Sequence, residues 1–194
     1  MMKDSGIDQA LQTLLAGNKR FAAMKQTHPN QDKNRRDEVR AGQKPFAVIV
    51  GCSDSRIPPE ILFDQGIGDL FVIRLAGNIV DDAALGSVEY AVDHLATRLV
   101  IVLGHAKCGA VTATAKGGDA HGHIGSIVKL IAPAVELAKG RPGDLVDNAI
   151  KENAKLVAAA IASSKPILQK MVQEGKIVVV PAYYDIDTGL VEVL

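Results

Sequence analysis

The sequence contains no tryptophan and 2 cysteines, and its 22 lysine and arginine residues are balanced by 22 aspartate and glutamate residues. Two cysteines make a disulfide scaffold a poor description, and the composition resembles that of a cytosolic enzyme. The balanced charge leaves no basic field to attract nucleic acid. No apolar run reaches the length of a membrane span, and the N-terminus lacks the apolar core of a signal peptide. We therefore expect a cytoplasmic protein that acts on a small molecule, although a leader removed in processing would leave the same sequence.

Length and patterning favour a single α/β domain. The 194 residues are 47% hydrophobic and can bury one good core, so we assign one domain to 1–194, with a helical arm (1–44) before an α/β core (45–194). Apolar runs without alternation are typical of parallel strands that are covered on both faces. We expect strands at 45–50, 70–73, 99–103, 177–180 and 189–193. The last two, separated by 183–188, would form a hairpin that adds an antiparallel edge to a mostly parallel sheet.

Helical patterns lie between these strands. The N-terminal segment carries apolar residues at helical spacing, and this amphipathic helix must pack on something. These residues are Ile7, Leu11, Leu14, Leu15 and Phe21. Further helices are expected at 82–95, 108–116, 127–139, 145–161 and 166–175.

Both cysteines lie in motifs that follow expected strands. The motif Cys-Ser-Asp-Ser-Arg runs from Cys52 to Arg56 after the first strand, and His105 and Cys108 follow the third. Open α/β sheets place their ligands at the carboxyl ends of strands, and a three-residue spacing brings His105 and Cys108 to one side of a turn. Two thiolates and one imidazole are a ligand set for catalytic zinc, which keeps a fourth position for water, substrate or a carboxylate such as Asp54.

Simpler interpretations of these residues stand beside the metal site. A free cysteine is commonly a buried apolar side chain, and two cysteines could also form one disulfide. His121 and His123 lie in the glycine-rich segment 117–123, which is typical of a solvated loop, so we leave them outside the ligand set.

The two motifs together resemble those of the β-class carbonic anhydrases. The core of the resemblance is GCSDSR and LGHAKCGAV, and the likeness runs from the N-terminal helix to Ala182–Asp185. It implies four parallel strands plus an antiparallel one, flanked by helices. It also implies an obligate homodimer, or a tetramer of dimers, whose N-terminal helix wraps the partner. The implied activity is the reversible hydration of carbon dioxide to bicarbonate with one zinc ion per chain.

The resemblance also assigns roles to the residues of the two motifs. Cys52, His105 and Cys108 match the zinc ligands. Asp54 and Arg56 match a carboxylate and guanidinium pair that orients the nucleophile, with Asp54 as a fourth ligand in a closed state. Two thiolates cancel the charge of zinc, so the metal should polarise water less than it does with neutral ligands, and hydration should increase above about pH 8.

Four further residues match positions that contact the substrate. Gln43 matches a glutamine that hydrogen-bonds the substrate, and Gly109 offers a backbone N–H to the pocket. Phe71 and Tyr90 match aromatic residues that line the pocket from the neighbouring subunit. From the residues alone, Gln43 is also compatible with an exposed helix end, and the two aromatic residues with a place in the core.

Some members of the class bind bicarbonate at a second, inhibitory site, which this chain matches only in part. That site uses a tryptophan three positions before the first cysteine, where this chain has Ile49. Arg74 and Tyr183 match its other members.

Three other functions use similar metal-binding residues. Carbonyl sulfide or carbon disulfide hydrolysis would use the same ligands, and the shape of the access channel would decide between the substrates. A non-catalytic dimeric interaction module with a structural zinc ion would account for both cysteines and His105 but not for the pair Asp54 and Arg56. A zinc deaminase would need a catalytic glutamate and a Cys-x-x-Cys pair that this chain does not have.

Overall fold

A central sheet organises the chain in the computed structural model, which describes residues 5–117 and 120–194. Its strands are β1 (Ala47–Gly51), β2 (Leu70–Arg74), β3 (Leu99–His105), β4 (Val178–Tyr184) and β5 (Val191–Val193). Within the described chain they form one sheet in the order β2-β1-β3-β4-β5. Only the pairing of β4 with β5 is antiparallel. This confirms the expected α/β class with its mostly parallel sheet and antiparallel edge.

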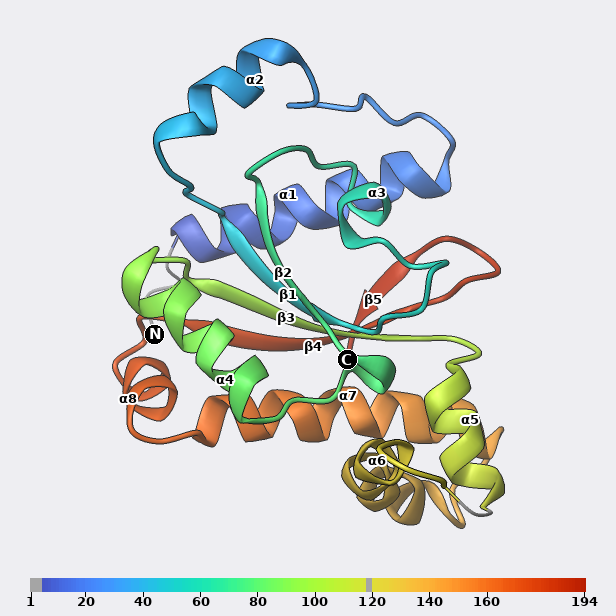
Figure 1. Cartoon of the computed structure of the whole chain (residues 1–194). Coiled ribbons are helices and arrows are strands. Elements are labelled where there is room, and N and C mark those ends of the chain that lie inside the picture. The colour runs from blue at the N-terminus through green and yellow to red at the C-terminus, as the bar shows by residue number, and fades with distance from the viewer. Residues whose placement is uncertain (1–4, 118–119) are drawn as a thin grey trace.

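Helices cover both faces of the sheet, so the molecule has three layers (Figure 1). One layer contains α1 (Ser5–Ala22), α2 (Lys33–Glu38) and α3 (Pro59–Leu62), with the short turn η1 (Val39–Ala41) after α2. The opposite layer contains α4 (Asp82–Glu89), α5 (Gly109–Lys116), α6 (Ile124–Ala138), α7 (Leu145–Ser163) and α8 (Ile167–Gln173). The turn η2 (Ala76–Asn78) follows β2, and the π-helical turn η3 (Tyr90–His94) continues α4. Among the described residues, no helix is long and apolar enough to cross a membrane.

The apolar run of β1 is fully buried because alternate side chains enter two different cores. Ala47 and Ile49 belong to the core that includes residues of α1, and Val48 and Val50 belong to the core that includes residues of α4 and α7. A strand that is covered on both faces needs no polar residues, which explains the absence of alternation in this run.

The bounds of several elements differ from the expected ones. Tyr183 and Tyr184 are part of β4, paired with Gly104 and His105, so the expected turn 183–188 is wrong at its start. The helix expected at 82–95 is α-helical only to Glu89 and then becomes a π-helical turn. The helix expected at 127–139 begins three residues earlier, at Ile124. Residues 118–119 of the expected loop 117–123 and the first residues of the domain assigned to 1–194 lie outside the described residues.

The N-terminal helix has its own partner within the chain. Ile7 and Leu14 of α1 are buried in the core on the sheet. The apolar face of α1 therefore does not by itself demand a second subunit. The close approach of α1 to α3 depends on Gly17, because a Cβ atom there would overlap the carbonyl oxygen of Phe63. Asn18 beside it donates to the carbonyl oxygen of Leu62 at 3.2 Å.

We expect Gly17→Ala to destabilise the fold by about 3 kcal/mol, because the backbone of Phe63 cannot move away from the added methyl group. The matched control is Gly86→Ala in α4, where no described atom beyond the neighbouring residues and the backbone of the same helix lies within 4 Å of the new Cβ. Removing a helical glycine at such an open position should stabilise the protein by about 0.5–1 kcal/mol. Urea unfolding of both variants measures the difference. Equal stabilities for the two variants would contradict the packing of α1 described here.

Candidate metal centre

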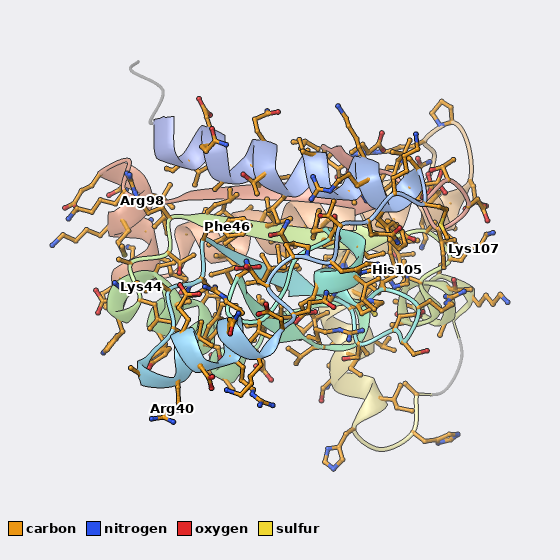
Figure 2. All side chains as sticks on the ribbon, turned by 90° about the horizontal axis from the view of Figure 1, so that it is seen from above. Arg40, Lys44, Phe46, Arg98, His105 and Lys107 are labelled. Atoms are coloured by element: carbon orange, nitrogen blue, oxygen red, sulfur yellow. The ribbon has the colours of Figure 1, made fainter. Side chains whose placement is uncertain are left out.

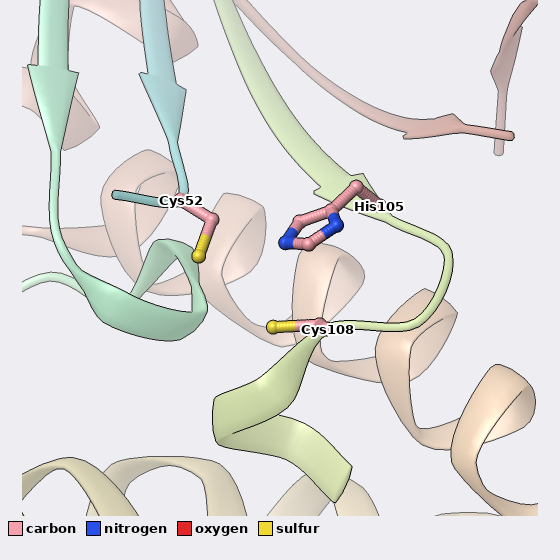
Figure 3. A group of neighbouring side chains, drawn as sticks. All are labelled: Cys52, His105 and Cys108. Atoms are coloured by element: carbon pink, nitrogen blue, oxygen red, sulfur yellow. The ribbon is translucent and has the colours of Figure 1, made fainter. Parts of the chain in front are cut away.

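Three side chains from distant parts of the sequence converge at the carboxyl edge of the sheet. Cys52 follows β1, His105 ends β3, and Cys108 lies directly before α5 (Figure 3). Gly51 pairs with Leu103 in parallel register, and this places the ends of the two strands side by side. The two Sγ atoms and a ring nitrogen of His105 all lie within 4.8 Å of one another, and all three residues are buried. The arrangement can hold a metal ion.

The imidazole of His105 is oriented as a metal ligand would be. Its Nδ1 lies 2.9 Å from the carbonyl oxygen of Ala106, and because a carbonyl can only accept, Nδ1 carries the proton. The lone pair is then on Nε2, which is buried and has no hydrogen-bond partner among the described residues. A buried nitrogen without a partner is costly unless something else satisfies it. A metal ion between the ring and the two thiols would do so, and a carbonyl on the other ring nitrogen is the usual support of a metal-bound histidine.

The two thiols do not hold equal charge. A hydrogen bond from Cys108 lowers the pKa of Cys52 to about 4, against the opposing effect of burial. The backbone N–H of Gly77 lowers it further. The hydrogen bond to the Cys52 thiolate in turn raises the pKa of Cys108. A divalent cation at this site would bind both sulfurs as thiolates, so Cys108 would have to lose its proton.

Asp54 and Arg56 form a closely held pair at the entrance to this cluster. Arg56 donates to both carboxylate oxygens, from Nε at 2.9 Å and from Nη2 at 2.8 Å, and its backbone N–H donates at 3.0 Å. The hydrogen bond from the Arg56 side chain is the main reason why the pKa of Asp54 is lowered to about 2. Oδ2 of Asp54 lies 4.0 Å from Nε2 of His105, so the carboxylate faces the ligand cluster. Arg56 also donates to the carbonyl oxygen of Lys107 at 3.2 Å and so links the two ligand loops.

Arg74 supports the first loop from the backbone side. Its Nε donates to the carbonyl oxygen of Cys52 at 2.8 Å, and its Nη2 donates to that of Asp54 at 2.6 Å. From the sequence, Arg74 matches only a member of the regulatory bicarbonate site. Its position at the end of β2 could have indicated a place beside the Cys52 loop, because the ends of β1 and β2 are adjacent.

Both residues that match the regulatory bicarbonate site, Arg74 and Tyr183, have other hydrogen-bond partners in this structure. Ile49 is buried inside β1. The hydroxyl of Tyr183 is hydrogen-bonded to Asp147, at a cavity of about 490 Å³ that Asp144, Asp147, Asp185 and Asp187 help to line. Lys107 lines the same cavity and pairs with Asp187, so charges of both signs surround it.

The substrate-contact residues divide into two groups. Gly109 is the exposed first residue of α5, directly after Cys108. Gln43 is exposed and precedes β1, at the opposite end of that strand from Cys52. Phe71 pairs with Val48 near the start of β1. Val48 lies four residues before Cys52, which is roughly 13 Å along the strand.

Tyr90 lies beside Phe71 and so falls in the same group as Gln43, away from Cys52. Its ring centroid lies 6.3 Å from that of Phe71, and Tyr90 is 46% exposed, so it is not a core residue. Figure 2 shows the same separation of the two ends of the sheet. Lys44 and Phe46, next to Gln43, lie toward one end, and His105 and Lys107 lie toward the other.

Comparison with known proteins identifies the family. The family model described as carbonic anhydrase matches residues 47–191. The chain is 39% identical over 184 residues to carbonic anhydrase 2 of Mycobacterium tuberculosis, covering 93% of this chain and 89% of that protein. It is 37% identical over 195 residues to the carbonic anhydrase of Mycolicibacterium smegmatis, covering 98% and 95%.

Solved structures show the same fold. The β-carbonic anhydrase CafA of Aspergillus fumigatus superposes with a TM-score of 0.75 at 28% identity, covering 95% of this chain and 90% of that chain. A tetrameric β-carbonic anhydrase of Sordaria macrospora has a TM-score of 0.77 at 24% identity, covering 96% and 97%. The chain therefore belongs to the carbonic anhydrase family, in its β class, whose general reaction is the hydration of carbon dioxide.

Proposed function

We propose that this chain hydrates carbon dioxide reversibly at a zinc ion held by Cys52, His105 and Cys108. The observation that carries the proposal is the convergence of two thiols and one histidine lone pair in a buried cluster. Zinc is the metal that this ligand set favours, because thiolate and imidazole ligands in tetrahedral geometry suit it and leave a fourth position free. When bound, zinc supplies hydroxide at moderate pH by lowering the pKa of water.

The chain's own residues would direct this chemistry. Arg56 holds Asp54 as a carboxylate with Oδ2 toward the cluster, so Asp54 can accept a proton at that atom and fix the direction of attack. While Arg56 holds it, Asp54 would be kept from coordinating the metal. Gly109 exposes backbone at the start of α5, where N–H groups can stabilise a developing negative charge.

The metal site of one chain could receive Gln43, Phe71 and Tyr90 only from another copy of the chain. They lie at the far end of β1 from Cys52, so a role in substrate binding requires a second subunit that presents its far end to the first site. We therefore propose a homodimer, or a tetramer of dimers, with shared pockets. A cytoplasmic location fits the need for reduced cysteines, since thiols persist in that compartment.

The zinc assignment is tested by Cys108→Ser. Losing one of two soft ligands should deplete the metal and abolish hydration, because a serine hydroxyl is a poor zinc ligand. Elemental analysis and a carbon dioxide hydration assay measure both. Ser55→Ala, which changes an exposed side chain of the loop after β1, is the control and should keep one zinc per chain. Full zinc occupancy with intact activity in Cys108→Ser would overturn the assignment.

The role of Arg56 is tested by Arg56→Ala. Without its partner, Asp54 is free to take the fourth metal position, so we expect activity to fall by about 10- to 100-fold with zinc content unchanged. The unmodified chain should gain activity above about pH 8, and the variant should lose this rise. Arg141→Ala is the matched control, since Arg141 is a similarly exposed arginine paired with the buried Glu152 at 2.6 Å. An alkaline rise that persists in Arg56→Ala would show that Arg56 does not restrain Asp54.

Shared pockets are tested by combining Gln43→Ala and Cys108→Ser chains by co-expression. Each variant alone should be weak or inactive. In a mixed dimer, one site has intact ligands and receives the intact Gln43 of the other chain, so about a quarter of all sites should work. The control pairs Cys52→Ser with Cys108→Ser chains, which leaves both sites damaged. If the first pair recovers no more activity than the control, Gln43 does not act across subunits.

A further inference from the structure

One backbone N–H group donates directly to a candidate ligand sulfur. The N–H of Gly77, in the turn η2, donates to Sγ of Cys52 at 3.2 Å in a buried setting. The two residues are 25 positions apart in the sequence. This contact depends on how the Gly77 peptide is held.

Gly77 is held in a conformation that only glycine adopts readily. Its φ of 73° and ψ of 22° lie in the left-handed region. A Cβ atom there would also meet Cδ1 of Ile131 at 2.6 Å. The position therefore combines backbone strain for other residues with a lack of space.

A buried asparagine fixes the other side of Gly77. Nδ2 of Asn153, on α7, donates to the carbonyl oxygen of Gly77 at 2.8 Å, and Asn153 is 1% exposed. Glycine has unusual backbone freedom, so this bond limits the directions in which its N–H can point. Asn153 is therefore connected to the sulfur of Cys52 by two hydrogen bonds, with only Gly77 between them.

Such a bond has a consequence for a metal with two thiolate ligands. The two sulfurs offset the 2+ charge of zinc and so reduce its power to polarise water. A hydrogen bond to a ligand sulfur draws electron density away from the metal, as it does in iron–sulfur centres. The N–H of Gly77 therefore restores part of the positive character that the sulfurs remove.

We propose that Asn153 is a positioning residue for the metal centre, which holds the Gly77 N–H on Cys52 and so limits electron donation by that sulfur. The proposal rests on the proposed function, because it requires a metal bound through Cys52. A purely structural Asn153 would instead contribute only to folding stability.

The chain offers a closely matched control for Asn153. Asn18 is also 1% exposed, lies in helix α1, and donates through Nδ2 to the carbonyl oxygens of Leu62 and Gly189. It lies outside the site. Asn153→Ala and Asn18→Ala each remove one buried side-chain amide from a helix, so both should lower stability.

The test compares the near-ultraviolet spectra of the cobalt(II)-substituted unmodified chain and of both variants. The thiolate-to-cobalt absorption should move to longer wavelength in Asn153→Ala, because its sulfur becomes the stronger donor, and should stay in place in Asn18→Ala. Zinc affinity, measured by competition with a chelator, should fall about 10-fold in Asn153→Ala, because the loss of the support that orients Cys52 outweighs the gain in donor strength. It should change less than twofold in Asn18→Ala. Equal spectra and equal affinities for the two variants would overturn the proposal.

A second measurement needs no variant. Proton NMR of the unmodified chain loaded with cadmium-113 should show a scalar coupling between the metal and the Gly77 amide proton, transmitted through the sulfur. Metal–thiolate absorption without this coupling would overturn the inference and leave the metal site standing. If the unmodified chain shows no thiolate-to-cobalt absorption, the proposed function fails and the inference fails with it.

Discussion

The parallel register between β1 and β3 is the constraint on which the rest of the site depends. Because Gly51 pairs with Leu103, the residues that follow the two strands leave the sheet side by side. Cys52 and His105 then meet without any long loop, and the short turn before α5 brings Cys108 to the same point. A shift of register by one residue would turn every side chain of a strand to the other face. Such a shift would also turn Cys52 away from His105, so the metal site requires this register.

Around this cluster, the supporting bonds come from several elements of the fold. Arg74 at the end of β2 holds the backbone of Cys52, and Asn153 on α7 holds Gly77, whose N–H contacts the sulfur. Arg56 joins the first ligand loop to the second through the carbonyl oxygen of Lys107. Lys107 has a φ of 58°, a strained value for a residue other than glycine. The two ligand loops are therefore held by side chains whose own positions are set by the sheet and by α7.

The sequence predicted the ligand cluster and the sheet because both depend on local signals. Apolar runs mark buried strands, and Cys52, His105 and Cys108 follow them directly. Asn153 could not be found in this way, because a polar residue in the middle of a helical pattern usually faces solvent. The extension of β4 through Tyr183 and Tyr184 was missed because these residues resembled the start of a turn, and their pairing with β3 is a tertiary effect. Gln43 was assigned from the resemblance, and its distance from Cys52 within one chain became visible only in the fold.

The most direct test of this account is X-ray absorption at the zinc edge of the purified chain. The account predicts a first shell of two sulfur atoms at about 2.3 Å and one histidine nitrogen at about 2.0–2.1 Å, with a nitrogen or oxygen ligand in the remaining position. A first shell made only of nitrogen and oxygen atoms would contradict it, because the two cysteines would then have no part in holding the metal.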